Sequence, residues 1–210
     1  MCDPVPRPQT LSQNLMNKPA VRCAGSAGRG PGPGPARPRE AVRLARIAIR
    51  PAGRGDLDRI RAWLRQPDIE DWWGPASATG AEVQIALQSP SALCRIIECD
   101  GEPIGYCHAI DATLWGEDLP EDLEPGTWDL DIFIASAAHR GLGAGHRALA
   151  LLKDEVFSTT LATAVCVFTS IRNEAAVRAY EKAGFAWQRI WNDSAVGPSW
   201  FMVARRPDPR

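Results

Sequence analysis

Apolar residues alternate with polar ones, or run continuously, in several short segments of the chain, and both patterns predict β-strands. These segments are 46–50, 93–99, 103–110, 128–135, 164–169, 185–191 and 200–205. Between the second and third of them, the Asp100-Gly101 pair favours a tight hairpin turn. We therefore expect a mixed, mostly antiparallel central sheet of about six to seven strands.

Helical spacing of apolar residues appears between these strands. It predicts helices over 56–66, 81–88, about 146–157 and 174–183, with the first ended by Pro67 and the last by Gly184. Residues 111–126 contain glycines and prolines and are predicted to form a loop. Helices and strands alternate around one sheet, so the expected fold class is α/β (α+β).

The first part of the chain shows neither pattern. Residues 1–44 contain eight prolines and a Gly/Pro tract over 28–35, a composition that buries too little apolar surface to fold, and we expect a disordered leader. Residues 45–206 have a typical single-domain length. The net charge of −1 divides accordingly: residues 1–50 hold 9 basic and 2 acidic side chains, and residues 51–210 hold 15 and 23.

Charge and hydropathy limit the partners of the domain. No apolar run approaches the ~18–20 residues that a membrane-spanning helix needs, and the N-terminus lacks the apolar region of a secretory signal. An acidic domain repels the phosphate backbone of nucleic acid and attracts cations. We expect a cytoplasmic protein with a cationic small-molecule partner, no nucleic acid and no membrane, and its oligomeric state stays open.

Cysteine and histidine spacing gives no sign of a metal site. The six cysteines form no CxxC pair, and Cys94, Cys107 and Cys166 lie in apolar segments, which predicts buried, reduced thiols. The three histidines are 108, 139 and 146, and they lack the close spacing of a ligand set. We expect no metal.

A glycine-rich turn, 140–145, joins the strand at 128–135 to the following helix. Glycines let a ligand approach the backbone, and the helix N-terminus directs unpaired N–H groups and a positive dipole at an anion. No Lys-Ser/Thr follows, so the turn is not a P-loop, and its late position disfavours a dinucleotide-binding fold. A phosphate site or a purely structural turn are the alternatives that spacing leaves open.

The chain resembles the GNAT superfamily of acyl-CoA-dependent N-acetyltransferases. Arg140, Gly143 and Gly145 match its pyrophosphate motif, and 173–185, Asn-Glu-Ala-Ala-Val-Arg-Ala-Tyr-Glu-Lys-Ala-Gly-Phe, matches its second element. The resemblance covers residues 46–205. It implies the GNAT fold and acetyl-CoA as cofactor, released as coenzyme A.

Further strings resemble one branch of that superfamily, the aminoglycoside 6′-N-acetyltransferases. They are Trp-Trp-Gly at 72–74, Gly-Glu-Pro-Ile-Gly-Tyr at 101–106, the block 131–157 and Tyr-Glu-Lys-Ala-Gly-Phe at 180–185. The branch implies acetyl transfer to an aminoglycoside 6′-amino group and antibiotic resistance. Acyltransferases of siderophore pathways share the block, so a hydroxylysine-type precursor, or a polyamine, is the alternative acceptor. A non-catalytic acyl-CoA sensor is the alternative from another class.

The resemblance also implies roles for individual residues. Asp131 would be the catalytic base or ammonium anchor, and Tyr180 the acid that protonates the thiolate; a solvent-facing aspartate and a packed core tyrosine are the structural alternatives. The residues implied to hold the cofactor are Phe133, Ile134, Arg140, Gly141, Leu142, Gly143, Ala144, Gly145 and Asn173. Asn173 is also a natural helix N-cap.

Carboxylates cluster just before Asp131. Residues 111–131 contain eight of them and no basic residue, a composition suited to a polycation. Candidate substrate-binding residues are Trp72, Trp73, Glu117, Asp118, Glu121, Asp122 and Asp129. One departure stands out: the resistance enzymes carry an acidic residue where this chain has Phe-Thr-Ser at 168–170, which puts the range of acceptors in doubt.

Overall fold

A seven-stranded sheet in the order β1-β2-β3-β4-β5-β7-β6 forms the centre of the molecule. The computed structural model describes residues 45–115, 119–120, 122–193 and 197–208, so the leader predicted over 1–44 lies outside it. The strands are β1 (Ile47–Pro51), β2 (Ala92–Cys99), β3 (Glu102–Asp111), β4 (Thr127–Ile134), β5 (Ala164–Ser170), β6 (Ala186–Asp193) and β7 (Gly197–Arg205). Every neighbouring pair is antiparallel except β4 and β5, which run parallel.

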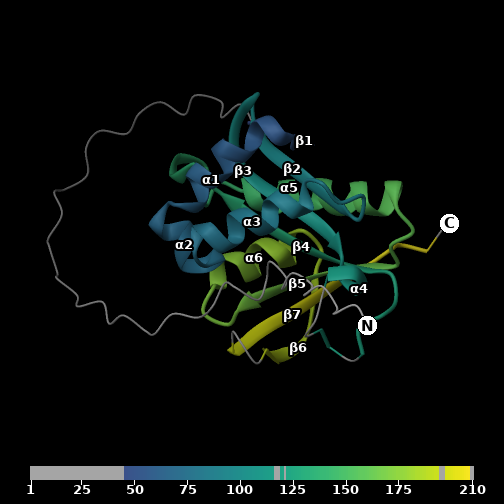
Figure 1. The fold of residues 1–210 in the computed structure, drawn as a ribbon. Coiled ribbons are helices and arrows are strands. Elements are labelled where there is room, and N and C mark those ends of the chain that lie inside the picture. Colours follow the sequence, from purple (N-terminus) through teal and green to yellow (C-terminus); the bar gives the residue numbers. More distant parts are fainter. Residues whose placement is uncertain (1–44, 116–118, 121, 194–196, 209–210) are drawn as a thin grey trace, which may run out of the picture.

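Helices cover both faces of this sheet (Figure 1). They are α1 (Leu57–Leu64), α2 (Pro67–Trp73), α3 (Ala76–Ala86), α4 (Ala112–Trp115), α5 (Ala144–Thr159) and α6 (Glu174–Lys182), with short 3₁₀ turns η2 (Arg54–Asp56) and η3 (Ala137–His139). The first three helices pack on one face, against Ile96 and Tyr106. Helix α5 packs on the other, against Ile97 and Cys107. Successive strand residues thus point to opposite cores.

The predicted strands and the α/β class are confirmed, and the hairpin turn has the backbone that was expected. Asp100 and Gly101 have φ of 51° and 86°, as a type I′ turn requires at both central positions. The cysteines predicted to be buried, Cys94, Cys107 and Cys166, are buried and free. The local pattern therefore specified most of the sheet.

Two helices were not predicted. Pro67 was interpreted as the end of the first helix, but it also begins α2, because its fixed φ suits the first helical position. The single turn α4 lies in the segment predicted as loop, and α3 begins at Ala76, earlier than the expected residue 81. These differences matter for function because α2 carries Trp72 and Trp73.

Strands β4 and β5 separate part of the way along their length. They pair only through Thr127, Trp128 and Asp129, opposite Ala164, Val165 and Cys166. The remaining residues of β4 stay paired with β3, and the remaining residues of β5 with β7. The divergence opens a gap within one continuous sheet, next to the C-terminal ends of two parallel strands.

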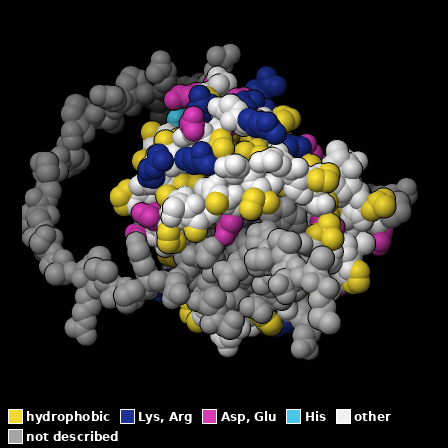
Figure 2. Space-filling model, viewed as in Figure 1, with side chains coloured by type: hydrophobic (Ala, Val, Ile, Leu, Met, Phe, Trp, Pro, Cys, Tyr) yellow, Lys and Arg dark blue, Asp and Glu magenta, His cyan; other side chains and the backbone are white. Residues whose placement is uncertain are grey.

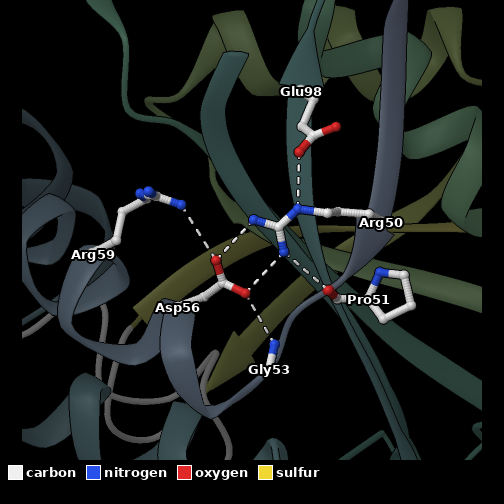
Figure 3. Close-up of polar contacts among 6 residues, drawn as sticks. All are labelled: Arg50, Pro51, Gly53, Asp56, Arg59 and Glu98. Carbon is white, nitrogen blue, oxygen red and sulfur yellow. Dashed lines mark hydrogen bonds and ion pairs between the residues drawn. The ribbon is translucent and has the colours of Figure 1, made fainter. Parts of the chain in front are cut away.

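An ion-pair network joins β1 and β2 to the turn before α1 (Figure 3). Arg50 donates two 2.8 Å hydrogen bonds to the Asp56 carboxylate and one, also 2.8 Å, to Glu98. The Asp56 carboxylate also accepts from the Gly53 amide at 3.0 Å and from Arg59 at 3.3 Å. The Arg50 guanidinium lowers the pKa of Asp56 to about 2, so the network is held by a fixed negative charge.

Surface charge is unevenly distributed despite the acidic total. Figure 2 shows Lys and Arg side chains gathered over the part of the surface near α1, where Arg54, Arg59 and Arg65 are exposed. The acidic excess of residues 51–210 is therefore not spread evenly over the surface of the domain.

Among the described residues, no helix has the length and apolar character needed to span a bilayer.

Candidate active site

A cavity of about 580 Å³ lies where β4 and β5 diverge. Its wall combines the end of β4, the end of β5, the glycine-rich turn, α2 and α6. The site residues predicted from sequence that line it are Trp72, Trp73, Asp131, Phe133, Ile134, Arg140, Gly141, Gly143, Gly145, Asn173 and Tyr180. Segments far apart in the sequence thus meet around one space, large enough for a small-molecule ligand.

Four predicted site residues are absent from the cavity wall. Leu142 and Ala144 lie within the turn but do not line the cavity, and Asp129 faces Cys166, whose Sγ lies 3.8 Å from its Oδ1. Asp122 is exposed and ion-paired with Arg189 of β6. Glu117, Asp118 and Glu121 lie outside the described residues.

The glycine-rich turn has a backbone that only glycine adopts readily. Gly141 and Gly143 have φ of 73° and 90°, and Gly143 is the N-cap of α5. A Cβ on Gly143 would also lie 2.8 Å from Cε1 of His146. Gly143 and Gly145 both line the cavity, so the N-terminus of the 16-residue helix α5 adjoins it without a side chain at these positions, as an anion site needs.

Arg140 connects the turn to two other walls of the cavity. Its guanidinium donates to the carbonyl oxygens of Ile134 at 2.6 Å and Ala135 at 3.0 Å, and it pairs with Asp68 of α2. These contacts hold β4, the turn and α2 in one arrangement. Direct contact between Arg140 and a phosphate stays a prediction, because the structure shows the guanidinium bound to these protein groups.

Asp131 is a buried carboxylate in the cavity wall, with a relative exposure of 5%. The alternative of a solvent-facing aspartate is therefore wrong. The residue of β3 directly opposite Asp131 is His108, and its Nε2 lies 3.8 Å from Asp131 Oδ2. Sequence reasoning assigned no role to His108. Its position opposite Asp131 follows from the β3–β4 register, which the sequence pattern alone did not supply.

Tyr180 lines the same cavity from α6 and is 5% exposed. Burial and the nearby carboxylates of Asp131 and Asp129 raise the pKa of its hydroxyl well above the usual value of 10. The phenol therefore keeps its proton and can act as a donor. It also packs against Phe185 with ring centroids 5.9 Å apart, so it is both a core residue and a cavity residue.

Asn173 begins α6 as predicted. Its Oδ1 accepts a hydrogen bond from the Ala176 amide at 3.1 Å, which satisfies one of the unpaired donors of the first turn. Asn173 also lines the cavity, and its backbone N–H donates to the Ser170 carbonyl at 2.9 Å, which joins the start of α6 to the end of β5.

Basic side chains in the wall were not predicted. His139, His146, Arg178 and Lys182 line the cavity, the last two one helical turn apart on α6. The Arg178–Lys182 spacing was the available signal in the sequence. These groups and the helix N-terminus fit a ligand with several phosphates, as acetyl-CoA has.

The end of β5 has no carboxylate in the cavity wall. Phe168, Thr169 and Ser170 line this side, and both hydroxyl residues are buried. Among the described residues, the carboxylates in the wall are Asp68, which Arg140 binds, and Asp131. The departure noted in the sequence therefore lies in the cavity wall.

The divergent strands, the amide-lined turn and the buried acid–phenol pair define an acyl-CoA-type transferase site. The chain matches the acetyltransferase (GNAT) domain family over residues 53–192, and it belongs to that family. The GNAT fold predicted from sequence is confirmed.

Within this family, the chain is similar to proteins that are named for aminoglycoside acetylation or resistance. The chain is 32% identical over 168 residues to an aminoglycoside N(6′)-acetyltransferase type 1 of Klebsiella pneumoniae, covering 76% of this chain and 83% of the relative. It is 33% identical over 86 residues to a kanamycin resistance protein of Rhizobium radiobacter, covering 41% and 79%. The solved structure of AAC(6′)-Ib with coenzyme A and kanamycin superposes with a TM-score of 0.69 at 28% identity, covering 77% and 95%.

Proposed function

We propose that this protein transfers the acetyl group of acetyl-CoA to the 6′-amino group of an aminoglycoside and thereby confers resistance. The observation that carries the proposal is that Asp131 and Tyr180 line the same cavity as the amide-rich turn. The curated relative that acts at the N(6′) position, and the AAC(6′)-Ib structure with coenzyme A and kanamycin, support the choice of acceptor.

The cofactor would enter along the divergent strands. The amides of 141–145 would hold the pyrophosphate, which the presence of Gly141, Gly143 and Gly145 in the cavity wall supports, and the β4 backbone at Phe133–Ile134 would face the acetyl end. Arg178 and Lys182 would add positive charge on the α6 side. The thioester would then be reached by the base on β4 and by the acid on α6.

Transfer would then be a direct attack by the amine. Asp131 removes a proton from the acceptor ammonium, the amine nitrogen bonds to the acetyl carbon, and the carbon–sulfur bond breaks. Tyr180 supplies the proton that the departing thiolate takes up. The nitrogen bonded to the acetyl carbon gives up its second proton to the Tyr180 phenolate, which restores the phenol and leaves the amide. Each of the three proton transfers thus has a protein group, so this scheme requires no metal.

The acceptor would be held by aromatic faces as well as charge. Trp72 and Trp73 lie in the wall on the α2 side, and indole faces attract cations and stack on sugar rings. Asp131 would hold the reacting ammonium before it takes the proton. Glu117, Asp118 and Glu121 remain further candidates for the other amines.

A second candidate acceptor is a smaller amine, such as a hydroxylysine-type siderophore precursor or a polyamine. The observation that favours it is the neutral end of β5, where Thr169 and Ser170 stand in place of a carboxylate. A polycationic antibiotic gains less from such a wall than a compact amine does.

We further propose that residues 45–206 form the complete catalytic domain and that the enzyme works in the cytoplasm, where acetyl-CoA is available. The charge division between residues 1–50 and 51–210 supports treating the leader as a separate part of the chain.

Thiol release from acetyl-CoA tests the proposal. Two aminoglycosides that differ only in a 6′-amine or a 6′-hydroxyl are compared with hydroxylysine and a polyamine. Turnover of the 6′-amine alone supports the proposal, and turnover only with hydroxylysine or the polyamine transfers the activity to the second candidate. Saturable acetyl-CoA binding without turnover on any amine would contradict an enzyme and favour a sensor.

A further inference from the structure

His108 is a buried histidine directed at the proposed base. It is 2% exposed, lies opposite Asp131 in the antiparallel register of β3 and β4, and places Nε2 3.8 Å from Asp131 Oδ2. It does not line the cavity, so it cannot touch the acceptor. Of the cavity residues that His108 contacts, Trp73 carries no titratable group, so an effect of His108 on the proposed proton transfer would pass through Asp131.

The other ring nitrogen identifies the tautomer. Among the described residues, Nδ1 of His108 is buried and has no hydrogen-bond partner. A buried N–H without an acceptor is costlier and rarer than a lone pair without a donor. The nearby Asp131 carboxylate favours a proton on the nitrogen that faces it. Both effects favour the tautomer with the hydrogen on Nε2.

Aromatic packing fixes the orientation of the ring. The Trp73 indole meets the His108 ring edge-on, with centroids 5.8 Å apart and planes at 90°. The centroid of the Tyr106 ring lies 5.7 Å from that of His108. Trp73 also meets Phe133 at 4.9 Å. The imidazole therefore sits in a rigid apolar enclosure that keeps Nε2 turned toward β4.

We infer that His108 is a positioning residue for the base: its Nε2–H holds the Asp131 carboxylate ionised and directed into the cavity. The inference rests on the proposed function, because that function gives Asp131 the role of base. The 3.8 Å separation is longer than a hydrogen bond, and such contacts often tighten only when substrate is bound.

His108 is not a proton relay. Burial lowers the pKa of its imidazole to about 3, so the ring stays neutral throughout the range in which Asp131 would work. A proton taken from the amine therefore stays on Asp131 until product leaves. The contribution of His108 is a fixed N–H dipole.

The remaining titratable groups near Asp131 do not change charge with it. Burial raises the pKa of Tyr106, Cys166 and Tyr180 well above their usual values, so all three are neutral when the carboxylate titrates. Asp129 is the other carboxylate on this face, two residues along β4. It is the same in both His108 variants, so a comparison between them isolates the contribution of the imidazole.

The test compares His108→Gln, which retains an N–H donor near the position of Nε2, with His108→Leu, which does not. With any amine that the wild type acetylates, loss of the donor should raise the pKa of Asp131. The acidic limb of kcat/KM should therefore move up by about one pH unit in His108→Leu and stay in place in His108→Gln. KM for acetyl-CoA should be unchanged in both.

A merely structural role would lower kcat in both variants and leave the limb where it is, which would overturn the inference. A limb that moves by the same amount in His108→Leu and in His108→Gln would overturn it as well, because the N–H donor is then not the cause.

An independent reading needs no turnover. In ¹⁵N-labelled free protein, the His108 ring should show a hydrogen on Nε2 and none on Nδ1, and it should not protonate down to pH 4.5. A hydrogen on Nδ1, or titration near pH 6, would refute the inference even if the enzyme is active. If no amine is acetylated but the Nε2–H tautomer is observed, the proposed function has failed and the geometric part of the inference stands.

Discussion

Asp129 and Cys166 form the last pair through which β4 and β5 run side by side. Two residues further along β4, beyond that pair, stands Asp131, already in the wall of the cavity. The point at which the sheet divides thus determines which carboxylate is exposed to ligand and which stays against a neighbouring strand. Asp129 and Asp131 share a face of β4, yet only the second lines the cavity.

The turn at Gly143 should be sensitive to a side chain. Gly143→Val places a β-branched residue at φ 90°, which strains the backbone, and its Cβ would lie 2.8 Å from the His146 ring, so that ring or the turn must shift. Titration calorimetry should show acetyl-CoA binding weakened by about 10-fold or more, as expected for a loss of about 1.4 kcal/mol or more.

Gly101→Val is the matched control for that variant. Gly101 has φ of 86° in the β2–β3 turn, and a Cβ there would meet no atom within 4 Å. It should lose similar stability and keep its affinity for acetyl-CoA. Equal affinities in both variants and the wild type would exclude the glycine turn from cofactor binding.

Removing the hydroxyl of Tyr180 should slow the chemistry and spare the binding. Tyr180→Phe keeps the ring packed against Phe185 and deletes the proposed proton donor. Steady-state kinetics should show kcat reduced by roughly 10- to 100-fold, at the low end of acid–base effects because a thiolate leaves readily. A rate within twofold of the wild type would leave Tyr180 with packing as its only role.

The pKa of Asp56 predicts a loss of stability in acid. Its folded pKa of about 2 is below the ordinary 3.8, so its ionisation stabilises the fold above pH 4, and this contribution disappears as the pH falls toward 2. Asp56→Asn should cost about 1–2 kcal/mol at pH 7, a range that allows for the partial exposure of Arg50.

Denaturant unfolding at several pH values measures this effect. The difference between Asp56→Asn and the wild type should shrink as the pH approaches 2. Asp58→Asn changes a fully exposed carboxylate two residues further along, in α1, and should have little effect at any pH. A constant difference from pH 7 to pH 2 would show that Arg50 does not stabilise the ionised form of Asp56.

The proposed boundary of the domain can be placed to within two residues. Ala45 accepts a hydrogen bond from Arg147 at 3.1 Å, and the Arg46 backbone exchanges two with Asp100, at 2.9 and 3.0 Å. A chain of 45–210 should therefore match the full chain in thermal midpoint and acetyl transfer. A chain of 47–210 should melt about 2 °C lower or more. Loss of activity in the chain of 45–210 would mean that residues 1–44 contribute to the site.

Local spacing was sufficient to predict the parts of the site that are contiguous in sequence. The glycine turn at 140–145 and the Asn173–Tyr180 helix are each short enough that their geometry follows from their own residues. The same holds for the strands, whose apolar pattern reports which face is buried.

The features that were missed depend on contacts between distant segments. His108 meets Asp131 only through the β3–β4 register, and Arg140 meets Asp68 only because α2 packs beside the turn. Asp122 looked like part of an acidic substrate site, but Arg189 of β6 pairs with it. Net charge along a loop does not reveal such partners.

The most direct test of the proposed mechanism is the effect of Asp131→Asn on catalysis and on binding measured separately. The amide keeps the size of the side chain and removes the base, so kcat should fall by roughly 10²- to 10⁴-fold while the acetyl-CoA dissociation constant stays within about twofold. A variant that retains wild-type kcat, with the acetyl-CoA affinity unchanged, would contradict a role for Asp131 as the base.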